Sequence, residues 1–155
     1  MGLMARFEPF PGLRYDDERL DYGEVTAPPY EAWGLPYRLT AGSEGGDLDN
    51  DGLTNFEEFA FGLIPNSGSS VNPITSPLNK ATGKFSYTRR ATPASTGLTY
   101  TVWTSVDLVT WTLDSTATSS QTVIGTVGEI QTVEATIPGT LPLTQSKLFI
   151  QVRAN

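Results

Sequence analysis

Residues 147–154, KLFIQVRA, carry the alternation that decides the fold class of this chain. In an extended strand, Leu148, Ile150 and Val152 would point to one side, while polar side chains of the same segment would point to the other. This alternation predicts a strand with one face on an apolar core and one face in water.

Five further segments upstream have the same character, being short and rich in Thr, Val, Ile, Tyr and Trp. Residues 81–155 contain 17 Thr and 7 Ser, which suit the hydrated face of antiparallel strands. Arg89 and Arg90 end the first segment, where we expect them to be solvated and to discourage pairing with another chain. Six short strands with turns between them predict a mainly β protein, a small antiparallel β-sandwich. The expected strands are residues 85–90, 98–105, 110–115, 121–127, 130–137 and 147–154.

The chain before residue 81 is less regular. The segment FEEFAFGLIP, residues 56–65, predicts a short helix because its apolar positions follow helical spacing, and Pro65 would end it. Residues 1–29 hold four of the eleven prolines and show no sustained periodicity. The expected organisation is an irregular leader at 1–29, a loop and short helix at 30–66, a Ser/Asn/Pro-rich linker at 67–80 and the β-sandwich at 81–155.

The composition limits the chemistry of this protein. The chain of 155 residues has no Cys and no His, so it lacks thiolates, the commonest general base and the commonest transition-metal ligand. No nucleophile can be paired with a base, and the neighbouring helical carboxylates Glu57 and Glu58 would point in different directions. We therefore expect no enzyme, and any metal must be bound by oxygen atoms, as hard cations such as calcium are.

The charge is distributed unevenly along the chain. Residues 1–60 carry 13 acidic and 4 basic side chains, a net charge of −9, whereas residues 61–155 carry 4 acidic and 6 basic side chains, a net charge of +2. Without a basic cluster, nucleic-acid binding is not expected. No apolar run approaches the roughly 18 residues that span a bilayer. The first residues, MGLMARFEPF, lack the apolar segment of a signal peptide, so we expect neither a membrane span nor a signal peptide in this chain.

Residues 47–58, DLDNDGLTNFEE, fit the calcium-loop pattern D-x-[DN]-x-[DN]-G-x5-E at every specified position. In such a loop the side chains at positions 1, 3 and 5 turn toward one centre, and Gly52 at position 6 permits the sharp turn. A solvated turn capped by Asp51 or Thr54 is the alternative, but it explains neither Gly52 nor Glu58. Because the acidic side chains would repel one another without a cation, we expect the ion to be structural. The predicted Ca²⁺ ligands are Asp47, Asp49, Asp51, the backbone carbonyl of Leu53, Asn55 and Glu58.

Aromatic side chains offer a second candidate site. Tyr100, Trp103 and Trp111 lie in or beside predicted strands and could form a platform for a sugar ring, although aromatic residues in strands more often belong to the core. Exposed, coplanar Trp103 and Trp111 would favour carbohydrate binding, and burial of both rings would exclude it.

The acidic loop and the following FEEFAFGLIPNSGSS resemble bacterial thrombospondin type 3-like and dockerin-like calcium repeats, whose loops read DxDxDGLTNxxEF. From YEAWGLPYRLT onward, residues 30–155 resemble the C-terminal region of large secreted proteins of Verrucomicrobia-type and planctomycete bacteria. The resemblance implies a non-catalytic attachment module of a secreted or cell-surface parent protein, with a cell-surface component or a polysaccharide as its partner. The alternative is a carbohydrate-binding accessory module of a polysaccharide-degrading enzyme. A dockerin needs two such repeats, so the single repeat argues against cohesin binding.

Residues 1–29 resemble a different family. MARFEPFPGLRYD and VTAPPYE are similar to the opening of an uncharacterised cytoplasmic bacterial family related to ParB-fold serine kinases. The matching segment is too short to bring the catalytic site of that family. The leader is therefore a candidate for foreign origin, by fusion, a mis-joined gene or engineering, and no kinase activity is expected from it.

Overall fold

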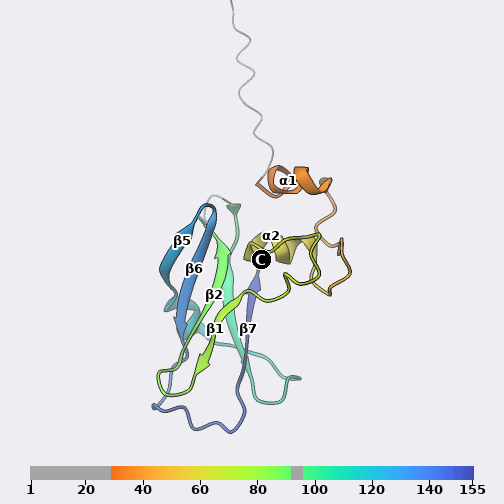
Figure 1. Cartoon of the computed structure of the whole chain (residues 1–155). Coiled ribbons are helices and arrows are strands. Elements are labelled where there is room, and N and C mark those ends of the chain that lie inside the picture. Colours follow the sequence, from red (N-terminus) through yellow and green to blue (C-terminus); the bar gives the residue numbers. More distant parts are fainter. Residues whose placement is uncertain (1–28, 92–95) are drawn as a thin grey trace, which may run out of the picture.

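A computed structural model describes residues 29–91 and 96–155. The predicted leader, apart from its last residue, lies outside the described residues. Within these residues, seven strands form two antiparallel sheets that face each other, accompanied by a few short helices (Figure 1). The prediction of a mainly β protein with a small antiparallel sandwich is confirmed.

The first sheet has the strand order β1-β2-β6-β5, and the second has the order β4-β3-β7. Every neighbouring pair is antiparallel. The central pair β2 and β6 is in register over the whole length of β2. The strands are β1 Ile74–Asn79, β2 Lys84–Arg90, β3 Tyr100–Ser105, β4 Thr112–Leu113, β5 Thr122–Val127, β6 Ile130–Thr136 and β7 Phe149–Ala154.

The core lies between the two sheets and follows the alternation of the strands. Leu148, Ile150 and Val152 pack against it together, as the sequence predicts for one face of that segment. The side chains that the three inner strands contribute to the core are Phe85 and Tyr87 of β2, Tyr100 and Val102 of β3, and Val133 and Ala135 of β6.

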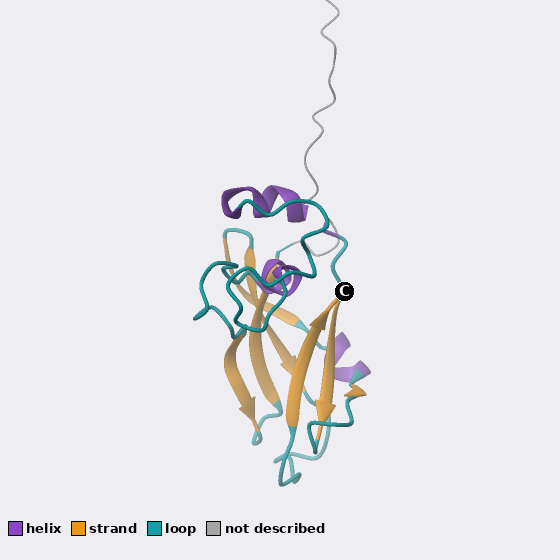
Figure 2. Cartoon of the chain, turned by 90° about the vertical axis from the view of Figure 1, so that its right-hand side faces the viewer, coloured by secondary structure: helices purple, strands orange, loops and turns teal. Residues whose placement is uncertain are grey.

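Short helices cover one end of the sandwich. The helix α2 lies beside the ends of β2 and β7, and α1 lies on the side of α2 that faces away from the sheets (Figures 1 and 2). Among the described residues, no helix has the length and apolar character needed to cross a membrane. The helical segments are α1 Pro29–Gly34, the 3-10 turn η1 Leu35–Tyr37, α2 Asn55–Phe61 and α4 Ser115–Ser119.

Two sequence predictions need correction here. Residues 74–79, placed in the linker of residues 67–80, form the edge strand β1, whose mostly exposed side chains show no apolar alternation. The strand expected at residues 110–115 shrinks to the two residues of β4. The carboxylate of Asp114 accepts a hydrogen bond from the backbone N–H of Ala117 at 2.8 Å, which begins α4 instead.

Candidate metal centre

The acidic loop of residues 47–58 is folded back onto its first side chain. The carboxylate of Asp47 accepts hydrogen bonds from the backbone N–H groups of Asn50, Asp51 and Gly52 at 2.7, 3.2 and 2.9 Å. Asn50 and Gly52 both have left-handed backbone conformations, with φ of 60° and 99°. Gly52 adopts this conformation without the strain that a side chain would add, which is the role the sequence assigns to it.

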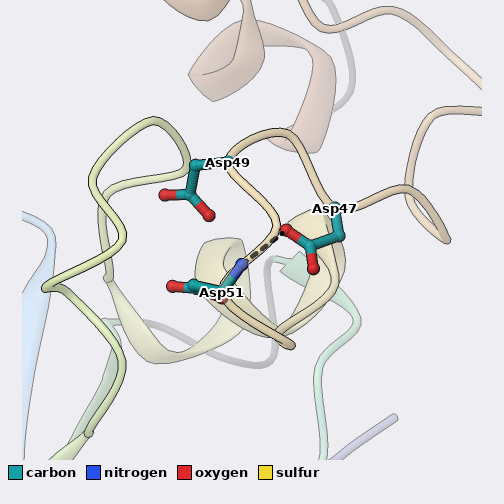
Figure 3. Close-up of side chains that lie close together, drawn as sticks. All are labelled: Asp47, Asp49 and Asp51. Atoms are coloured by element: carbon teal, nitrogen blue, oxygen red, sulfur yellow. Dashed lines mark hydrogen bonds between the residues drawn. The ribbon is translucent and has the colours of Figure 1, made fainter.

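The loop brings three aspartates together (Figure 3). Asp47, Asp49 and Asp51 each place a carboxylate oxygen within 4.8 Å of the others. Oδ1 of Asp51 accepts a hydrogen bond from the backbone N–H of Leu53 at 2.8 Å, while Oδ2 is buried without a partner. Both carboxylate oxygens of Asp49 are likewise buried without a partner. Three half-buried negative charges therefore share one small volume.

Glu58, in the first turns of α2, carries a fourth carboxylate, which lies outside the group of three aspartates but interacts electrostatically with it. Its side chain is 0% exposed, and neither carboxylate oxygen has a hydrogen-bond partner. Burial raises the pKa of Glu58 to about 7, and the negative charges of Asp49, Asp51 and Asp47 raise it as well. A buried carboxylate among like charges is unfavourable in its ionised form unless a cation accompanies it.

Asn55 is held with its amide oxygen free. The side chain is 3% exposed, and its Nδ2 donates to the backbone carbonyl of Ser43 at 2.7 Å. This bond fixes the amide so that Oδ1 is buried without a partner. The backbone N–H of Asn55 donates to the carbonyl of Gly46 at 2.7 Å. Residues 43–46, directly before the loop, therefore orient Asn55, a role that the sequence analysis missed although the Gly-Gly pair at 45–46 marks this segment.

Oxygen atoms without partners concentrate in this loop. Across the described residues, six buried side-chain atoms lack a hydrogen bond, and all six are oxygens of Asp49, Asp51, Asn55 and Glu58. A calcium ion takes six to eight oxygen ligands, so the donor set fits the ion that the sequence predicts. The acidic cluster can thus hold a metal ion. The participation of the Leu53 carbonyl stays a prediction.

The start of α2 is fixed by a capping box. Thr54 accepts a hydrogen bond from the backbone N–H of Glu57 at 3.2 Å, and the Glu57 carboxylate accepts one from the backbone N–H of Thr54 at 2.8 Å. The carboxylate of Glu57 is therefore used to cap α2, whereas the two carboxylate oxygens of Glu58 have no hydrogen-bond partner. The helix ends at Gly62, whose φ is 70°, so the predicted end at Pro65 is three residues too late.

The end of α2 is held by side chains of the sandwich. Three consecutive backbone carbonyls of its last turn accept hydrogen bonds from Thr88, Arg90 and Tyr100, which we call the clamp residues. The bonds are Arg90 Nε to the carbonyl of Phe59 at 2.9 Å, the Tyr100 hydroxyl to that of Ala60 at 2.7 Å and the Thr88 hydroxyl to that of Phe61 at 2.9 Å.

The expectation of a solvated strand end at Arg89 and Arg90 is wrong. β2 lies between β1 and β6, and Arg90 is only 5% exposed. Its guanidinium lies 4.2 Å from the centre of the Phe59 ring and donates from Nη1 to Glu129 at 2.8 Å. Burial lowers the pKa of Arg90, while the charge of Glu129 acts in the opposite direction. Arg89 is half-buried and donates to Gln121 at 3.0 Å.

The three aromatic candidates do not form a common exposed surface, because one of them is buried. Tyr100 is 6% exposed and belongs to the core, so its prediction as a surface ligand-binding residue is wrong. Trp103 is half-buried, its indole N–H donates to Thr101, and the guanidinium of Arg153 lies 4.1 Å from the centre of its ring. Trp111 is half-buried in the segment before β4. The two tryptophans are neither exposed nor buried, so carbohydrate binding stays a prediction.

No family model, curated protein or solved structure matches this chain.

Proposed function

We propose that this protein is a non-catalytic module whose fold is completed by one structural calcium ion in the loop of residues 47–58. The observation that supports the proposal is the set of six buried oxygen atoms without hydrogen-bond partners, all within this loop and the start of α2. Each unsatisfied buried polar group costs about 1–3 kcal/mol, and more when it is charged. A bound cation would remove this cost for all of them together.

The proposed ion is structural because the helix that follows the loop is already fixed at its other end. Sensor calcium loops act by changing the angle between two helices. Here the clamp residues hold the last turn of α2 on the sandwich. Extracellular modules use structural sites of modest affinity, with dissociation constants of about 0.1–1 mM. We therefore include in the proposal that the module belongs to a secreted or cell-surface parent protein and has an attachment role.

Each predicted ligand would have a definite part in binding. Asp49 and Glu58 would offer oxygens that have no other partner, Asp51 would offer Oδ2, and Asn55 would offer Oδ1. Asp47 would bind through its carboxylate while it also accepts the hydrogen bonds that shape the loop. A bound calcium ion would supply the positive charge that lets these carboxylates remain ionised when buried.

Thermal unfolding in calcium and in EDTA tests the proposal. Calcium at about 100 times its dissociation constant should stabilise the fold by about 2.7 kcal/mol, which appears as a higher melting temperature. Asp49→Ala should remove most of this increase. Glu134→Gln is the matched control, because Glu134 pairs with Lys84 on the outer face of the sandwich, away from the loop. The absence of a calcium effect in the unmodified protein, or an equal effect in Asp49→Ala, would contradict a structural ion.

A further inference from the structure

The helix α2 connects the proposed calcium site to the sandwich, and it is too short to hold its own position. It spans seven residues, whereas isolated helices shorter than about 12–15 residues are marginal in water. Its place is therefore set by contacts outside the helix. Glu58 is buried with both carboxylate oxygens unpartnered and interacts electrostatically with the aspartates of the loop, and the next residue, Phe59, is held by Arg90.

Arg90 makes two kinds of contact with Phe59. Its Nε donates to the backbone carbonyl, and its guanidinium lies over the aromatic ring, 4.2 Å from the centre. The opposite end of the guanidinium is bound by Glu129. Because Arg90 is 5% exposed, its removal would leave a space beneath the ring and would leave the Phe59 carbonyl with only the hydrogen bond from the Gly62 N–H at 3.4 Å.

A second set of contacts leads from Phe59 to Asn55. The rings of Tyr30 and Phe59 pack edge to face with their centres 5.6 Å apart. The Tyr30 hydroxyl is hydrogen-bonded to Oγ of Ser43 at 2.9 Å, and the backbone carbonyl of Ser43 holds the amide of Asn55. Arg90 thus supports the ring whose neighbours orient Asn55 as well as the backbone that carries Glu58.

We infer that Arg90 is a positioning residue for the calcium site, although it binds no ion itself. By fixing Phe59, it holds Glu58 and, through Tyr30 and Ser43, the amide of Asn55 in place for the ion. Calcium binding and the docking of α2 on the sandwich then favour each other, because the coupling of two binding events is reciprocal. This inference rests on the proposed calcium function.

Calorimetric titration of the full chain with calcium tests the inference. Arg90→Met keeps much of the volume of the side chain but removes its hydrogen bonds, and it should raise the calcium dissociation constant about fivefold or more. Lys84→Met is the matched control, since it removes one positive charge from the other end of the same strand. Loss of positive charge alone would strengthen the binding of a cation, so weaker binding in Arg90→Met cannot arise from long-range electrostatics.

The titrations are made well below the unfolding temperature of each variant, where a merely less stable domain would keep its calcium affinity. A folded Arg90→Met variant with unchanged affinity would overturn the positioning role and leave the calcium site itself intact. If the unmodified protein binds no calcium, both the proposed function and this inference fail. If Arg90→Met does not fold, Tyr100→Phe and Thr88→Val each remove a single clamp hydrogen bond, and they decide the matter. Weaker calcium binding in these two variants supports the inference, and unchanged binding in both overturns it.

Discussion

Asn55 depends on a glycine that the calcium-loop pattern does not contain. A Cβ atom at residue 46 would lie 3.1 Å from Asn55 Nδ2 and 3.2 Å from the carbonyl oxygen of Ser43, whereas a Cβ atom at residue 45 would meet no heavy atom within 4 Å. We expect Gly46→Ala to displace the amide and weaken calcium binding several-fold, and Gly45→Ala to leave binding unchanged. Calorimetric titration of both variants checks this, and equal affinities would show that Asn55 tolerates the added methyl group.

We expect Glu58 to make the protein sensitive to pH when calcium is removed. Its pKa in the folded protein is about 7, above the usual 4.5, so the folded state binds this proton more tightly than the unfolded state does. The contribution to stability is fully present below about pH 4.5 and is lost as the pH rises through about 7. In EDTA we therefore expect the melting temperature to fall between about pH 5 and about pH 8.

The control for the pH experiment is Glu58→Gln, which has no proton to lose and should show a much smaller decrease. In saturating calcium the decrease should disappear, because the ionised carboxylate is the form that binds the ion. A melting temperature in EDTA that rises over this range would mean that Glu58 does not dominate the pH dependence.

The acidic residues of the loop were predictable, but Arg90 was not. The pattern of residues 47–58 specifies its acidic positions through local spacing, so the approach of Asp47, Asp49 and Asp51 needed no knowledge of the fold. The burial of Arg90 depends on the pairing of β2 with β6 and on the place of α2. The local sequence of two arginines at a strand end does not distinguish arginines that face water from arginines that face a helix.

Among the helices, α2 is the one whose start matters to the site. Its capping box joins Thr54 to Glu57, directly before Glu58. Thr54→Ala should destabilise the protein by about 1 kcal/mol, because the backbone N–H of Glu57 then loses its partner. Thr54→Ser keeps the hydroxyl and should recover most of this loss. Urea denaturation in saturating calcium measures both, and equal stability of the Ala and Ser variants would contradict the role of the cap.

The residues at which helices and strands begin and end were harder to predict than the presence of those helices and strands. Helical spacing identified α2, but its end depends on the left-handed conformation of Gly62 rather than on Pro65. β1 escaped the sequence analysis because an edge strand with exposed polar side chains lacks the alternation that marks a half-buried strand. β4 was overestimated because Asp114 begins a helix where the aromatic and β-branched residues suggested a strand.

The stability of the whole sandwich depends on the layer between its sheets. Val133 of β6 is fully buried in that layer, whereas Val127 of the edge strand β5 is 83% exposed. Val133→Ala should therefore cost about 2 kcal/mol through lost burial and the cavity left behind. Val127→Ala should change stability by less than about 0.5 kcal/mol. Thermal or urea denaturation of the pair checks this contrast, and similar losses would mean that β5 is buried in solution.

For the molecule as a whole, the sequence predicted the fold class but not the order of the strands. Residue alternation shows which side chains face a core, and this was sufficient for a sandwich. It does not show that β6 lies between β2 and β5, or that β3 pairs with β7 across 43 or more intervening residues of the chain. Such long-range pairing is set by how all the strands pack together, which no single segment encodes.

The clamp residues also affect the order in which parts of the protein form during folding. All predicted ligands lie within residues 47–58, and a loop of about 10 residues closes in roughly 10–100 ns. Arg90 and Tyr100, in contrast, are 31 and 40 residues away from the carbonyls that they hold. We therefore expect the loop of the unfolded chain to bind the proposed calcium ion only for short times. Lasting binding should follow the slower pairing of β2 and β3 with their neighbours.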